Sequence, residues 1–88
     1  MSLIRTDVIV NFSDGSNRRY DMEIEVGEVT AAELFCDLVT ELCTQEPETY
    51  RRCTFNPCIA VNSVPLFPDE LLPKNTAIVD LRARREGG

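Results

Sequence analysis

The sequence predicts a single α+β domain in which one main helix lies across one face of a mixed β-sheet. Three observations support this. Two segments with two-residue alternation are joined by a turn, a segment with helical spacing follows, and another alternating segment leads into the last few residues. A chain of 88 residues that is 43% hydrophobic can bury one modest core but hardly two. We therefore expect one domain over residues 1–81 and a flexible tail over residues 82–88.

The first two strands are expected to form a hairpin. Over residues 6–12 one side of the chain is suited to the core and carries Thr6, Val8, Val10 and Phe12. Residues 13–17 are Ser, Asp, Gly, Ser and Asn, which favour a turn. In the returning strand the apolar residues are Tyr20, Met22, Ile24 and Val26, and they alternate with Arg19, Asp21, Glu23 and Glu25. The outer face of this strand is therefore expected to be acidic.

A helix is expected to follow, and its start is well specified. Thr30 and Glu33 have the spacing of a capping box, and Val29 and Leu34 have that of a hydrophobic staple. The apolar stripe that should face the core consists of Ala31, Leu34, Phe35, Leu38 and Leu42. The solvent side carries Glu33, Asp37 and Glu41.

The second half of the chain predicts two more strands. Pro47 ends the helix, and residues 44–57 are irregular, with room for a short helix. A strand is expected over residues 58–62. Prolines punctuate the following connection, in which we expect inward packing of Leu66, Phe67, Leu71 and Leu72. In the last strand, Ala77, Val79 and Leu81 alternate with Ile78, Asp80 and Arg82. The order hairpin, helix, strand, connection, strand is that of a β-grasp fold.

The charge of the chain restricts its partners. A net charge of −6 and a pI near 4.5 argue against nucleic acid or an anionic membrane, because both repel an acidic surface. The N-terminal residues contain no apolar stretch long enough for a signal peptide or a membrane span. We therefore expect a cytoplasmic protein that binds other proteins.

The cysteine pattern favours free thiols. The chain has four cysteines and no histidine, and no pair has the CxxC spacing of common zinc sites. Plant-type iron–sulfur proteins use a C-x4-C-x2-C motif. Cys53 and Cys58 have the first of these spacings, but no third cysteine follows, so metal binding is the less favoured alternative. Free, partly buried thiols, at Cys36 and Cys43 as well, fit a reducing compartment. The sequence contains no histidine, no paired carboxylates in a recognisable site motif and no glycine-rich phosphate-binding loop. We therefore expect that the protein is not an enzyme and that it needs no cofactor.

The most informative feature is the pair of glycines, Gly87 and Gly88, that ends the sequence. A carboxylate becomes a good electrophile once it is adenylated, and a tail without Cβ atoms can pass through a narrow channel to reach ATP. The arginines beside the pair, Arg82, Arg84 and Arg85, are suited to carboxylates on an activating enzyme. The alternative for the two glycines is that they form an arbitrary chain end. The alternative for the arginines is that they are a solvated run of charges. Seven extended residues from Arg82 would span roughly 23 Å.

These residues resemble the ubiquitin-like β-grasp proteins. Residues 79–88 are similar to the end of ubiquitin, where a strand leads into an arginine-rich tail and a diglycine, and Arg84 matches the arginine that ubiquitin's activating enzyme reads. The resemblance implies a bacterial protein modifier. An E1-like activating enzyme would adenylate Gly88 with ATP, with an E2-like conjugating enzyme, a target protein amine and a JAB-type or other diglycine-specific peptidase as further partners. Lys74, the only lysine, could link successive copies.

A second resemblance, to the bacterial sulfur carriers of molybdopterin and thiamine synthesis, implies another product. Residues 60–62, Leu72 and Ile78 are similar in spacing to their Ala-Val-Asn turn, leucine and last-strand valine. The same adenylate would then receive sulfide and become a C-terminal thiocarboxylate. A third alternative is a noncovalent interaction domain whose acidic outer sheet face binds a basic partner. Such a domain would not need Gly87 or Gly88.

Overall fold

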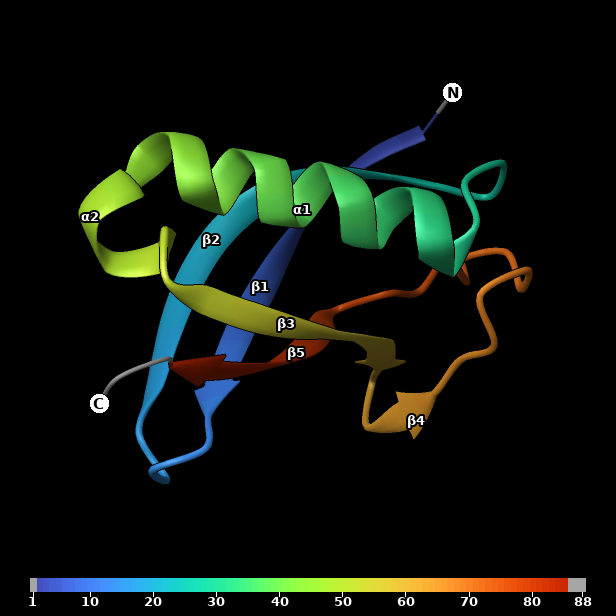
Figure 1. Ribbon diagram of the computed structural model, residues 1–88. Helices are drawn as coiled ribbons and strands as arrows, with labels where there is room; N and C mark the ends of the chain where they lie inside the picture. Colours follow the sequence, from blue (N-terminus) through green and yellow to red (C-terminus); the bar gives the residue numbers. More distant parts are fainter. Residues whose placement is uncertain (1, 86–88) are drawn as a thin grey trace.

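The computed structural model describes residues 2–85 and confirms the predicted fold class. Its elements are β1 (Ser2–Phe12), β2 (Asn17–Val26), α1 (Ala31–Gln45), α2 (Pro47–Tyr50), β3 (Cys53–Val61), β4 (Val64–Pro65) and β5 (Ile78–Arg85). The five strands form one mixed sheet in the order β2-β1-β5-β3-β4, and α1 crosses one face of it (Figure 1). β1 and β5 run parallel, whereas the other neighbours are antiparallel. This is the expected β-grasp arrangement.

The hairpin and the helix start form as their local sequence predicts. The turn after β1 is closed by Asp14, whose carboxylate accepts hydrogen bonds from the backbone N–H and the hydroxyl of Ser16 at 2.8 and 2.6 Å. At the start of α1 the Thr30 hydroxyl oxygen accepts from the Glu33 N–H at 3.2 Å, which confirms the expected N-cap. The Glu33 carboxylate in turn accepts from the Thr30 hydroxyl.

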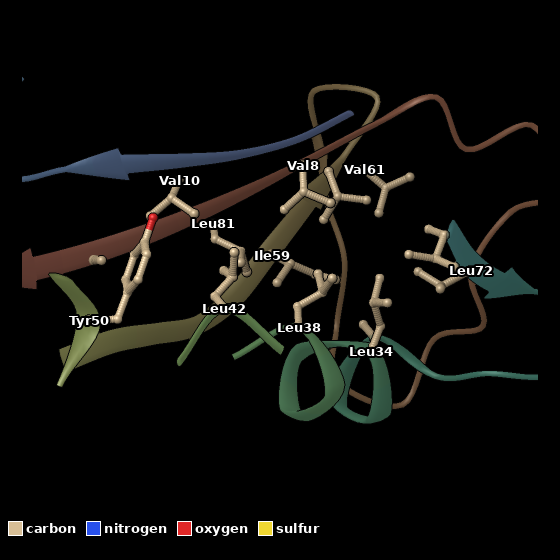
Figure 2. Packing of buried hydrophobic residues seen from close by; sticks show 14 of the residues in the cluster. Val8, Val10, Leu34, Leu38, Leu42, Tyr50, Ile59, Val61, Leu72 and Leu81 are labelled. Carbon is tan, nitrogen blue, oxygen red and sulfur yellow. The ribbon is translucent and has the colours of Figure 1, made fainter. Parts of the chain in front are cut away.

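The core lies between α1 and the sheet. Val8 and Val10 of β1 are fully buried and lie on the same face of the sheet as Leu81 of β5, opposite Leu38 and Leu42 of α1 (Figure 2). Each of these side chains contributes roughly 1.5–3 kcal/mol by leaving water. Phe35, which was expected in the same stripe, is half-buried at the border of the core.

Strand β3 is longer than the sequence suggested. It begins at Cys53 and runs through Pro57, whereas the sequence predicted an irregular segment up to residue 57 and a strand from residue 58. The pairing with β5 shifts register between Asn56 and Ala60, and the Asn56 side chain accepts from the Cys58 N–H at 2.9 Å. Such a bulge lets a strand continue past a proline, because the residue without an N–H falls where no ladder bond is needed.

The connection between β4 and β5 corrects one expectation. Leu72 is buried and Leu66 is half-buried, but Phe67 and Leu71 are 73% and 54% exposed, so the expectation of inward packing is wrong for these two. The Leu72 N–H donates to the Val29 carbonyl at 3.0 Å, and this holds residues 71 and 72 extended. Successive side chains of an extended chain point to opposite sides, so only one leucine can face the core.

Thr6 is the one predicted core residue that carries a buried polar atom without a partner in the described part of the chain. Its side chain is 2% exposed. We expect Thr6→Val to raise the free energy of unfolding by about 1 kcal/mol, because an isosteric methyl group replaces a hydroxyl that lost its water. Urea unfolding at neutral pH would measure the change. A lower stability would mean that the hydroxyl has a partner in solution.

Candidate functional site

The candidate site is the end of β5, which leads to the diglycine. β5 lies in the middle of the sheet, where Ala83 pairs with Phe12 of β1 and Arg85 pairs with Cys53 of β3 (Figure 1). The strand includes residues 82–85, which the sequence had assigned to the tail. The reason is that Ala83 is small and apolar and continues the buried row of Val79 and Leu81.

Gly87 and Gly88 lie outside the described residues, as does Glu86. Three residues lead from the end of the strand to Gly88, and a fully extended chain of three residues spans at most about 10 Å. The seven-residue reach expected from the sequence is therefore shortened by the part that belongs to β5. Any enzyme that acts on Gly88 must approach the end of the sheet closely while β5 stays paired.

The structure divides the three arginines between the two faces of the sheet. Arg82 and Arg84 are exposed on the outer face, opposite α1. They border a shallow groove whose other walls include Asn56 and Cys58 of β3. No carboxylate within residues 2–85 forms an ion pair with either guanidinium. Both are therefore available to an acidic partner.

Arg85 points to the other face and packs on an aromatic cluster. Its guanidinium carbon lies 4.1 Å from the centre of the Phe12 ring, a cation–π contact. The Phe12 ring stacks on Tyr50 with centroids 6.2 Å apart, and Tyr50 stacks on Phe55 at 5.8 Å. Hydrogen bonds from Ser16 lower the pKa of Asp14, and the positive charge of Arg85 lowers it further. The end of β5 is thus fixed by packing as well as by strand pairing.

A hydrogen-bond network that the sequence did not reveal supports this cluster. The Tyr20 hydroxyl donates to the Glu46 carboxylate and contacts the Tyr50 hydroxyl, while Arg18 donates to Glu46 at 2.9 Å. Burial raises the pKa of Tyr20, and the hydrogen bond to Glu46 adds to this rise. Burial likewise raises the pKa of Tyr50. Both tyrosines are therefore protonated at neutral pH. Apolar periodicity could find the rings but not the pairing of their hydroxyl groups.

Lys74 lies at the opposite end of the molecule from the end of β5. It is exposed, and its side chain lies near Gly27. Gly27 directly follows β2, at the open end of the hairpin. The end of β5 instead pairs with Phe12, at the far end of β1. The structure therefore does not bring Lys74 together with the arginines.

Asn62, part of the Ala-Val-Asn pattern, has a clear structural role. It adopts a positive φ of 51° just after β3, a conformation that asparagine tolerates. Its side-chain oxygen accepts from the N–H groups of Ala77 and Ile78 at 2.8 and 3.1 Å, and its amide donates to the Asn75 carbonyl at 3.1 Å. These bonds fix the start of β5. The pattern therefore has an explanation in the fold that does not depend on the chemistry of the tail.

We expect Asn62→Ala to lower the free energy of unfolding by about 2 kcal/mol. The change removes three hydrogen bonds and places alanine at a positive φ. Asn62→Asp keeps the accepting oxygen and should cost less than half as much. Chemical unfolding of both variants would measure this, and equal losses would show that the accepted bonds are not the important ones.

The cysteines are free, as expected. Cys36 and Cys58 are exposed, whereas Cys43 and Cys53 are half-buried against the core. Desolvation raises the pKa of Cys53, so its thiol is less reactive than an exposed one. Among residues 2–85, no three Cys, Asp or Glu side chains are grouped so that they could hold a metal ion.

Comparison with protein-family models and with curated proteins gave no match to this chain. Within residues 2–85, no helix has the length and apolar character needed to cross a membrane.

Proposed function

We propose that this chain is a protein modifier that acts through the carboxylate of Gly88, present at the chain end or exposed there by a peptidase. An E1-like enzyme would adenylate this carboxylate with ATP, take it up on a cysteine as a thioester and pass it on, with an E2-like enzyme, to an amine of a target protein. The observation that carries the proposal is the central strand β5, which ends at Arg85, three residues before Gly88.

Two features of the strand support this function. Pairing with β1 as far as Ala83, pairing with β3 as far as Arg85, and the contact between Arg85 and Phe12 hold the end of β5 in one position, so that a partner can recognise the domain and find the tail beside it. Arg82 and Arg84 are exposed and unpaired within the described chain, as binding to acidic side chains of an activating enzyme requires.

Mass spectrometry of the protein from its native host tests the proposal. The expected result is Gly88 joined by an isopeptide bond to a lysine or an N-terminal amine of another protein. A free chain in which sulfur replaces one carboxylate oxygen would instead support the sulfur carrier. Neither product, together with full function after removal of Gly87 and Gly88, would support the noncovalent interaction domain.

The two outward arginines give a second expected result. Arg84→Glu should raise the KM for this protein about tenfold in ATP–pyrophosphate exchange by the activating enzyme, because a repulsive charge replaces an attractive one. Lys74→Glu is the matched control, since it makes the same charge change at the opposite end of the molecule. Equal kinetics for both variants would remove Arg84 from the contact surface.

A further inference from the structure

The two sides of α1 that border its buried stripe differ in charge. The side next to β2 is acidic and carries Glu33, Asp37 and Glu41. Successive residues of a helix are rotated by about 100°, so Phe35, Val39 and Cys43 lie on the opposite side of the stripe. These three residues are half-buried and uncharged. Because β2 and β3 lie on opposite sides of the central strands, this second side of α1 faces β3.

One cysteine lies at each end of the short connection from α1 to β3. Cys43 is two residues before Gln45, where α1 ends, and Cys53 is the first residue of β3. The end of α1 and the start of β3 lie at the same end of the molecule, where α2 joins them (Figure 1). The two cysteines are therefore close in the fold as well as in the chain.

The Cys53 side chain points toward the helices. It is half-buried against the core, as is Cys43. Its thiol donates to the Thr49 carbonyl of α2, with the sulfur and oxygen 3.5 Å apart. Cys53 also pairs with Arg85, and residues directly opposite in an antiparallel pair share one face of the sheet. Both thiols thus lie in the layer between the helices and β3.

The two thiols also act on each other electrostatically. Desolvation raises the pKa of Cys53, the Arg85 guanidinium opposes this rise, and a thiolate at Cys43 adds to it. The remaining cysteines do not belong to this pair. Cys36 is two turns before Cys43 on α1, about 10 Å along the helix, which is too far for a disulfide. Cys58 is exposed and lines the groove on the outer face of the sheet.

We propose that Cys43 and Cys53 form a redox-modification site, at which a reversible disulfide ties the end of α1 to the start of β3. The oxidant is a small disulfide such as glutathione disulfide. One protein thiol loses its proton, and its sulfur attacks the oxidant to give a mixed disulfide and one glutathione thiolate. The second protein thiolate attacks the protein sulfur of the mixed disulfide and expels the second glutathione. The chain loses two hydrogen atoms, and two molecules of reduced glutathione are formed.

The bond would act on stability through a short loop. It would close the chain between positions 43 and 53, which lowers the entropy of the unfolded chain. It would also hold the residue that pairs with Arg85 at the end of β5. In a reducing compartment such a bond is transient and responds to oxidation. This site is independent of Gly87 and Gly88, so its test does not depend on the proposed function.

Oxidation of the full chain tests the proposal. The test protein is the variant C36S/C58S, which keeps Cys43 and Cys53 and removes the two exposed thiols. The matched control is C43S/C53S, which keeps the other two cysteines. Both are treated with excess glutathione disulfide under native conditions. Intact mass and peptide mapping then identify the product, and thermal unfolding before and after treatment gives the change in Tm.

We expect C36S/C58S to lose two hydrogen atoms, to yield one peptide pair linked between Cys43 and Cys53, and to gain about 10 °C in Tm. Dithiothreitol should reverse all three changes. The control should form no internal disulfide. The proposal is overturned if C36S/C58S carries only glutathione adducts or if its Tm falls on oxidation. It is also overturned if the linkage forms only in urea, or if the control closes its own disulfide as fast, because both results would mean reaction through unfolded chains.

Discussion

Removal of Gly87 and Gly88 is expected to lower adenylation by the activating enzyme at least a hundredfold, with no change in the free energy of unfolding. The loss is large because the chain would then end one residue after β5, and a reacting carboxylate displaced by even about 1 Å can cost a hundredfold in rate. Stability should not change because the buried residues of the described chain all lie within residues 6–83. ATP–pyrophosphate exchange and urea unfolding measure the two quantities.

Two milder variants separate the effect of tail length from the effect of side-chain bulk at the two glycines. Gly87→Val and Gly88→Ala keep the length of the tail but add Cβ atoms, which a narrow channel excludes. Their exchange rates should lie between those of the parent and the shortened chain. If all variants were activated as well as the parent, the carboxylate of Gly88 would not be the reacting group, and the noncovalent alternative would be favoured.

Tyr50→Ala is expected to have the largest effect on stability, about 3–5 kcal/mol. Tyr50 is 1% exposed, and its ring lies between Phe12 and Phe55. Its removal leaves a cavity beneath the end of β5 and deprives the Tyr20 hydroxyl of a partner. Since small domains are stable by only about 5–15 kcal/mol, this variant should be partly unfolded at 37 °C.

Tyr50→Phe is the control for the ring. It keeps the stacking and removes only the hydroxyl, so a loss of about 1 kcal/mol is expected. Thermal and urea unfolding of both variants would provide the comparison. Similar losses would mean that the hydroxyl network with Tyr20 and Glu46, rather than ring packing, holds this part of the fold together.

The sequence predicted the features that depend on neighbouring residues. The cap at Thr30, the turn at Asp14 and the buried row of β1 follow from local spacing, and all are present. The features it missed depend on distant partners. Ala83 is in a strand because Phe12 of β1 and Phe55 of β3 pair with it. Phe67 was expected in the core because it is apolar, but it is exposed.

The candidate site was predicted in part. The sequence placed three arginines next to the diglycine but treated them as one group. Alternation along β5 puts Arg82 and Arg84 on one face and Arg85 on the other, and this could be inferred only once the strand was known to reach Arg85.

The parallel pairing of β1 and β5 has a consequence for the synthesis of the protein. The two central strands come from residues 2–12 and 78–85, so the middle of the sheet cannot close until residues 78–85 have left the ribosome. Contacts of such long sequence separation slow folding. A nascent chain that stops short of β5 would have neither the closed sheet nor the residues that follow it, and so a partner that recognises both would not bind it.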